Sequence, residues 1–262
     1  MRSLLRHPVP AAFAALLVAV QISYPLTTGV TRDRVTVIVV LLSAGTALAH
    51  AVATRGFRYA AGFLLIVSGI GLLTEIIGTA TGYPFGCYDY AVDRLGPALA
   101  GVPLVVPLAW TGGLYPIWIV AGILTGRTAG RIALTAVGAV GWDLFLDPQM
   151  VADDQWTWCD TESGLPGLAH IPLTNYPGWF AVGLAMAVLL TAWDRSTTRR
   201  AGANDAVPIA VFLWTWLGSA LAHAVFLGLP VSAAYGVVGM GVLGIPLLRV
   251  LWRSRIPSGT LA

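Results

Sequence analysis

Residues 59–90 read "YAAGFLLIVSGIGLLTEIIGTATGYPFGCYDY", and this stretch decides the class of fold. Between Tyr59 and Ile77 the only charged side chain is Glu75. A run of about 20 apolar residues is long enough to cross a bilayer as a helix. The glycines, the Gly-Tyr-Pro-Phe-Gly turn and the Tyr-Asp-Tyr that follow are typical of a loop. The stretch therefore predicts a transmembrane helix that carries a carboxylate close to its exit from the membrane.

The composition of the whole chain agrees with a membrane protein. Of the 262 residues, 57% are hydrophobic and 10% are charged, against about 25% charged residues in a soluble domain. The net charge of +3 gives no indication of a nucleic-acid partner. The two cysteines are too few for a disulfide scaffold and lack the spacing of metal ligands, so we expect no metal site.

Apolar runs of spanning length occur eight times along the chain. They cover residues 8–26, 35–53, 57–80, 102–125, 130–148, 177–193, 207–228 and 231–251. With eight spans both termini lie on one side of the membrane. Of the 15 cationic residues, Arg32, Arg34 and Arg94 fall on one side and the rest on the side of the termini. The positive-inside rule then places both termini on the cytoplasmic side of the cell membrane. We predict an all-α, polytopic membrane helix bundle.

Residues 1–262 are expected to form a single integral membrane domain with two long outer loops, 81–101 and 149–176. These loops hold several acids and a dense set of aromatic residues. Cys87 and Cys159 lie one in each loop, on the oxidising side, where a disulfide could join them. Two free buried thiols are the alternative.

Acidic groups fall at similar depth on separate spans, beneath these loops. Glu75 lies in the outer half of one span, and Asp143 and Asp147, four residues apart, share a face of another. His223 lies in the outer half of a third. Intramembrane carboxylates are costly and usually mark a functional path. The alternatives are an ion pair or cap for Glu75, an interfacial helix end for Asp147 before Pro148, and a hydrogen-bonded interior role for His223.

Three motifs resemble the integral-membrane carotenoid-biosynthesis protein family, which includes bisanhydrobacterioruberin hydratase and related carotenoid hydratases. They are "GYPFGCYDY" (82–90), "WDLFLDPQMV" (142–151) followed by "WTW", and "IPLTNYPGWF" (171–180). The resemblance covers residues 57–195. It implies a reaction in which water adds across the terminal isoprene double bond of a linear carotenoid. No organic cofactor or metal is implied.

The residues near the acids suit the separate steps of such a reaction. A carboxylic acid that keeps its proton can protonate the alkene, and aromatic faces can stabilise the resulting tertiary cation. We expect Asp143 or Glu75 to donate the proton, and Asp147 to tune the pair or orient water. Aromatic candidates for the pocket wall, some of which could also be an interfacial belt, are Tyr83, Phe85, Tyr88, Trp142, Trp156 and Trp158. Other candidates for binding substrate, water or product are Asp89, Asn175, Tyr176 and His223.

Two other functions fit the same features. A membrane terpene or carotenoid cyclase would use the same protonation step and let a second double bond capture the cation. A non-enzymatic carotenoid or lipid carrier, or a transporter, could use the broken span near Pro103 and Pro116. Every alternative implies a hydrophobic ligand and contact with membrane lipid, and the sequence leaves the oligomeric state open.

Overall fold

The computed structural model describes residues 7–254 and confirms the all-α membrane fold. Within this range, eight helices are long and apolar enough to cross a bilayer. The first of these spans ends in the 3₁₀ segment η2, and the seventh ends in the π-helical segment η3. The helices are α1 Pro8–Ser23, η2 Tyr24–Leu26, α2 Gly29–Arg55, α3 Phe57–Thr81, α4 Val105–Leu124, α5 Thr128–Ala152, α6 Asn175–Arg195, α7 Ala206–Leu221, η3 Ala222–Phe226 and α8 Pro230–Arg253. Arg2, Arg6 and Arg255, which enter the charge count, lie outside the described residues.

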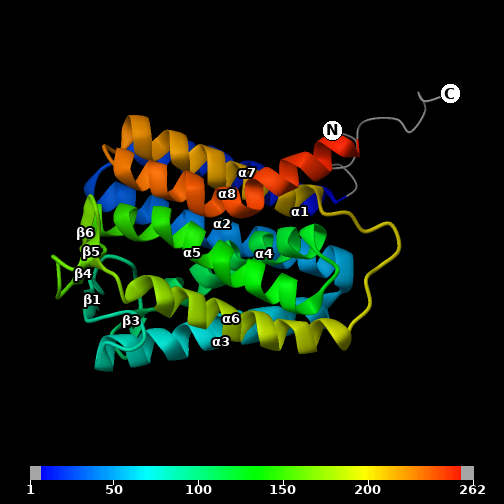
Figure 1. The fold of residues 1–262 in the computed structure, drawn as a ribbon, viewed down its shortest axis with the longest axis horizontal. Helices are drawn as coiled ribbons and strands as arrows, with labels where there is room; N and C mark the ends of the chain where they lie inside the picture. The colour runs from blue at the N-terminus through cyan, green and yellow to red at the C-terminus, as the bar shows by residue number, and fades with distance from the viewer. Residues whose placement is uncertain (1–6, 255–262) are drawn as a thin grey trace.

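The helices lie roughly side by side along the long axis of the molecule (Figure 1). Helix α4 is central and packs against α2, α3, α5, α7 and α8. Its buried residues include Trp110, Tyr115 and Trp118, so the span that is interrupted by prolines and glycines is the interior helix of the bundle. Helix α1 packs mainly on α2, with a smaller contact to α7, and is therefore peripheral.

Glycines and prolines set several helix boundaries. Gly56 at φ 91° makes the turn between α2 and α3, and Gly82 at φ 78° ends α3 in the left-handed conformation that favours glycine. Pro148 does not end α5 as the sequence boundary suggested. The helix continues to Ala152, so Asp147 lies inside it, and the alternative of a helix end at Asp147 is not the one observed.

Short strands gather at one end of the bundle, on the left in Figure 1. They pair as β1 with β4, β2 with β3, and β5 with β6. Their bounds are β1 Tyr88–Tyr90, β2 Ala98–Leu99, β3 Val102–Pro103, β4 Trp156–Trp158, β5 Gly164–Leu165 and β6 Leu168–Pro172. The start of α1 and the end of α8 lie at the opposite end (Figure 1). The two long loops thus form one cap over the bundle.

Close packing of α5 on α8 depends on a glycine pair. A Cβ added at Gly141 would lie 2.6 Å from a backbone carbon of Gly239, which is closer than two non-bonded carbon atoms approach each other. We expect Gly141→Ala to cost about 1–3 kcal/mol by overpacking and to lower the midpoint of thermal unfolding in detergent. The matched control is Gly69→Ala, whose added Cβ meets no atom within 4 Å. Equal midpoints for the two variants would contradict this prediction.

Candidate active site

The β1–β4 pair presents one aromatic face to the bundle. Tyr88 pairs with Trp158 and Tyr90 with Trp156 across the two antiparallel strands. Side chains alternate along a strand, so these four rings share a face while Asp89 points the other way. Neighbouring rings are in contact, with centroids 4.9 Å apart for Tyr88–Trp158 and 5.6 Å apart for Tyr90–Trp156.

Glu75 of α3 holds this aromatic face against the bundle. Its Oε2 accepts hydrogen bonds from the hydroxyls of Tyr88 (2.5 Å) and Tyr90 (2.8 Å). Its Oε1 accepts one from the indole N–H of Trp110 on α4 (3.0 Å). Both carboxyl oxygens are therefore occupied as acceptors, and a loop and two helices meet at one buried side chain.

The two tyrosine hydroxyls remain donors over a wide pH range. Burial, reinforced by the Glu75 carboxylate, raises the pKa of both Tyr88 and Tyr90. A phenol that stays protonated continues to donate its hydrogen bond. The attachment of β1 to α3 is therefore maintained at neutral and moderately alkaline pH.

Asp143 and Asp147 of α5 lie one helical turn apart and are bridged by Asn175, the first residue of α6. The Asn175 amide N–H₂ donates to Asp143 Oδ2 and to Asp147 Oδ2, each at 2.8 Å. Asp147 Oδ1 also accepts from the indoles of Trp156 (2.7 Å) and Trp158 (3.1 Å). Asp147 thus accepts three N–H groups, as an ionised carboxylate can.

The Asp143–Asn175 pair keeps spare capacity for hydrogen bonding. Asp143 Oδ1 and Asn175 Oδ1 are buried, and neither finds a partner within residues 7–254. Buried polar atoms without a partner are rare and costly in folded proteins. Asp143 is therefore the acid of the three with a carboxyl oxygen left over for chemistry.

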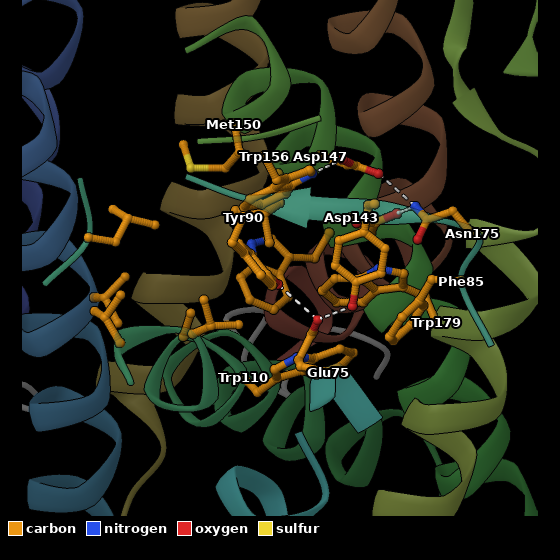
Figure 2. A pocket seen from close by; sticks show the side chains of 18 of the residues that line it. Glu75, Phe85, Tyr90, Trp110, Asp143, Asp147, Met150, Trp156, Asn175 and Trp179 are labelled. Carbon is orange, nitrogen blue, oxygen red and sulfur yellow. Dashed lines mark hydrogen bonds between the residues drawn. The ribbon is translucent and has the colours of Figure 1, made fainter. Parts of the chain in front are cut away.

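A cavity of about 70 Å³ lies between the three acids. Figure 2 shows Glu75 on one side, Asp147 and Asn175 on the other, and aromatic rings between them. Trp110 and Trp179 are stacked with centroids 4.0 Å apart, and Trp142 meets Trp179 edge-on at 5.6 Å. Such an apolar, aromatic space suits a hydrocarbon, and ring faces attract positive charge when desolvated.

A family model described as "Carotenoid biosynthesis protein" matches residues 35–243, from α2 into α8. The chain belongs to this carotenoid biosynthesis protein family. A curated relative is bisanhydrobacterioruberin hydratase from Haloarcula japonica, 34% identical over 133 residues. The matched region spans 48% of this chain and 43% of that protein, so the chain covers less than half of the relative's length. No solved structure matches this member of the carotenoid biosynthesis protein family.

The structure brings most of the predicted site residues of this family member to the cavity. Those that line it are Glu75, Phe85, Tyr88, Trp142, Asp143, Asp147, Trp156, Trp158 and Asn175. Within residues 7–254 no group of three or more His, Cys, Asp or Glu is placed to hold a metal ion. The absence of a cofactor stays a prediction.

Four predicted residues lie elsewhere. Tyr83 is 77% exposed in the turn after α3, and Asp89 is exposed because it lies on the outer face of β1. His223 lies in the single π-turn η3 and bonds Ser232 (2.9 Å) and Gln149, so the interior role is the one observed. Tyr176 is half-buried in α6 and does not line the cavity.

Three aromatic residues that line the cavity were absent from the predicted site. Tyr90 stands in the same Tyr-Asp-Tyr as Tyr88, and strand alternation predicts that both rings share a face. Trp179 stands in the third family motif. Trp110 lies in the span that is interrupted by prolines and glycines, and nothing local in the sequence marks it as a partner of Glu75.

A disulfide joins the two outer loops. Cys87 and Cys159 are bonded, their Cα atoms are 5.3 Å apart, and the Cys159 N–H donates to the Cys87 carbonyl at 2.9 Å. Cys87 precedes Tyr88 and Cys159 follows Trp158. The crosslink therefore holds the ends of β1 and β4, and the open choice between a disulfide and free thiols is decided for the disulfide.

Removing this crosslink should loosen the aromatic face. We expect the Cys87→Ser, Cys159→Ser double variant to lose about 2–4 kcal/mol of stability, because the unfolded chain regains freedom. The measurement is the thermal unfolding midpoint in detergent. Wild-type protein treated with a reductant should shift to the same midpoint as the double variant. Identical midpoints for untreated wild type and the double variant would show that the crosslink does not stabilise the loops.

Proposed function

We propose that this protein is a carotenoid hydratase, which adds water to a terminal isoprene double bond of a linear carotenoid without a cofactor. The observation that carries this proposal is the pair of unpartnered oxygens, Asp143 Oδ1 and Asn175 Oδ1, beside an aromatic cavity in the bundle. Membership of the carotenoid biosynthesis protein family and the similarity to a protein named as a hydratase support it.

Asp143 is the proton donor in this proposal. Glu75 and Asp147 each accept three hydrogen bonds, which leaves neither an oxygen that can readily carry and release a proton. Asp143 accepts one hydrogen bond, at Oδ2, so Oδ1 can hold the proton. Of the two donors that the sequence left open, the hydrogen-bond pattern favours Asp143 and gives Glu75 a positioning role.

The reaction then balances within the site. The Asp143 O–H bond breaks, and its proton bonds to the less substituted alkene carbon, whose π electrons form the new C–H bond. The tertiary cation left on the other carbon faces the indoles of Trp142 and Trp179. A water held by Asn175 Oδ1 adds its oxygen to the cation, and the proton that it loses returns to the Asp143 carboxylate. The acid is thereby regenerated, and the net change is the addition of one water.

Polar groups at the cation separate this proposal from its closest rival. A cyclase must keep water away from the cation until a second double bond attacks it. Here Asp143, Asp147 and Asn175 stand at the cavity and offer sites for water. We therefore expect water, and not an alkene, to capture the cation.

We also propose that residues 1–262 act as one membrane domain whose outer loops, 81–101 and 149–176, cover an extracytoplasmic site. Arg32, Arg34 and Arg94 belong to the strand-bearing end, while the other arginines within residues 7–254 belong to the opposite end. The positive-inside rule then puts the opposite end, with both termini, in the cytoplasm.

The test is a pigment extract from cells that make a linear carotenoid, with and without this chain. A new, more polar pigment whose mass has increased by water supports the hydratase. A new pigment of unchanged mass would identify a cyclase, and an unchanged pigment pool would identify a carrier. Expression of the Asp143→Asn variant at the same level is the matched control.

A further inference from the structure

A second and larger cavity lies beside the candidate active site. It measures about 530 Å³ and is lined by residues of α1, η2, α2, α4, α5, α7 and the π-turn η3. We call it the apolar chamber. Within residues 7–254 no Asp, Glu, Lys, Arg or His lines it. A cavity without charge suits a hydrocarbon and offers no group to pair with a charged lipid headgroup.

The apolar chamber adjoins the acid-lined cavity. Six residues line both: Thr36, Val40, Ala109, Trp142, Leu146 and Met150. Trp142 is the largest of them and directly precedes Asp143. A Cβ added at Gly113 would lie 2.2 Å from the Trp142 ring, so the glycine leaves the space that this ring fills. The shared lining thus places the chamber next to the cavity that Asp143 lines.

The chamber also reaches the lipid-facing surface between α1 and α7, two helices that are in contact. Four of its lining residues are more than half exposed: Ile22 (54%), Leu26 (74%), Leu221 (58%) and Phe226 (57%). On a membrane-spanning bundle such apolar side chains face the acyl chains of the bilayer. The side-chain Oε1 of Gln21 accepts a hydrogen bond from the Trp214 indole at 2.8 Å, which links the two helices beside this opening.

We propose that the apolar chamber binds the isoprenoid chain of the substrate. The chain enters sideways from the bilayer between α1 and α7, with its terminal double bond leading toward Asp143 and its far end still in lipid. This inference rests on the proposed function for the identity of the occupant. It adds the route and the binding site, and it implies that one end of a linear carotenoid reacts at a time.

Cysteine protection tests the chamber without relying on turnover. The chain's two cysteines are joined in the disulfide, so a single substitution supplies the one reactive thiol. Ser219→Cys places it on α7 in the chamber lining, with little change in size. Leu217→Cys places it two residues away, at a position where the native leucine is 51% exposed and does not line the chamber. Each variant, in nanodiscs, is labelled with N-ethylmaleimide with and without an acyclic carotenoid, and hydrated product is measured in the same samples.

We expect the carotenoid to slow labelling of Ser219→Cys at least about fivefold and to leave Leu217→Cys unchanged. Equal rates for Ser219→Cys with and without carotenoid would overturn the chamber proposal, whether or not hydrated product forms. Protection without any hydrated product would retain the chamber and reject the hydratase. Thr215→Trp, which fills the chamber, should in addition weaken carotenoid binding, and Leu217→Trp should not. Unchanged binding by a folded Thr215→Trp variant would also overturn the proposal.

Discussion

Replacing Asp143 by asparagine should abolish hydration almost completely while the bundle stays folded. The amide has nearly the shape of the carboxyl group and can still contact Asn175, but it has no acidic proton to give to the alkene. A positioned general acid contributes about 10²–10⁴-fold to a rate. We therefore expect turnover of a linear carotenoid by purified Asp143→Asn to fall by at least about 10²-fold.

The control for this variant is Asp93→Asn, which makes the same chemical change in an exposed loop residue. It should retain wild-type turnover. Thermal unfolding of both variants shows whether the bundle is intact. An Asp143→Asn protein with near wild-type turnover would remove Asp143 from the mechanism.

The second large effect is expected at Glu75, and it is structural. Glu75→Leu removes the shared acceptor of Tyr88, Tyr90 and Trp110. A buried donor without a partner costs about 1–3 kcal/mol, and this variant removes the acceptor of three such donors at once. We expect a fall of several °C in the thermal unfolding midpoint and a smaller yield of monodisperse protein in detergent.

Two milder changes separate positioning from chemistry at Glu75. Tyr90→Phe removes one donor and leaves Glu75 with two partners, so its midpoint should fall less than that of Glu75→Leu. Glu75→Gln keeps an acceptor oxygen and most of the volume, and its folded fraction should retain turnover within about tenfold. If Glu75→Gln lost activity as severely as Asp143→Asn, Glu75 would be the proton donor. A Glu75→Leu protein as stable as wild type would contradict the structural role.

Most of the fold was predictable because a bilayer imposes a simple rule. A span needs about 20 apolar residues, and eight such runs became eight helices with ends that moved by only a few residues. The largest differences came where local signals are weak. The second span was predicted to begin at residue 35 but begins at Gly29. Arg32 and Asp33 therefore lie within the helix, where they pair with Asp153 and Arg94 of the outer loops.

The site was predictable in its acids and less so in its partners. Helix spacing places Asp143 and Asp147 on one face, and span direction places Glu75 at a similar depth. Which helix a given face meets depends on packing between segments far apart in sequence, and the hydrophobic periodicity of one segment does not predict that packing. This is why Trp110 was not predicted as a partner of Glu75, and why His223, at the right depth, was wrongly grouped with the acids. Its helix turns it toward Gln149 and Ser232 on α5 and α8.

The most direct test of the central claim is hydration by purified protein in solvent made with D₂O and ¹⁸O-labelled water. The substrate is an acyclic carotenoid in nanodiscs, and mass spectrometry with NMR locates the labels. We predict a tertiary alcohol that carries solvent oxygen, with one solvent deuterium on the neighbouring carbon, and no such product from Asp143→Asn. Recovery of unlabelled carotenoid, or of a deuterated isomer without oxygen, would contradict the claim that this site adds water to a protonated alkene.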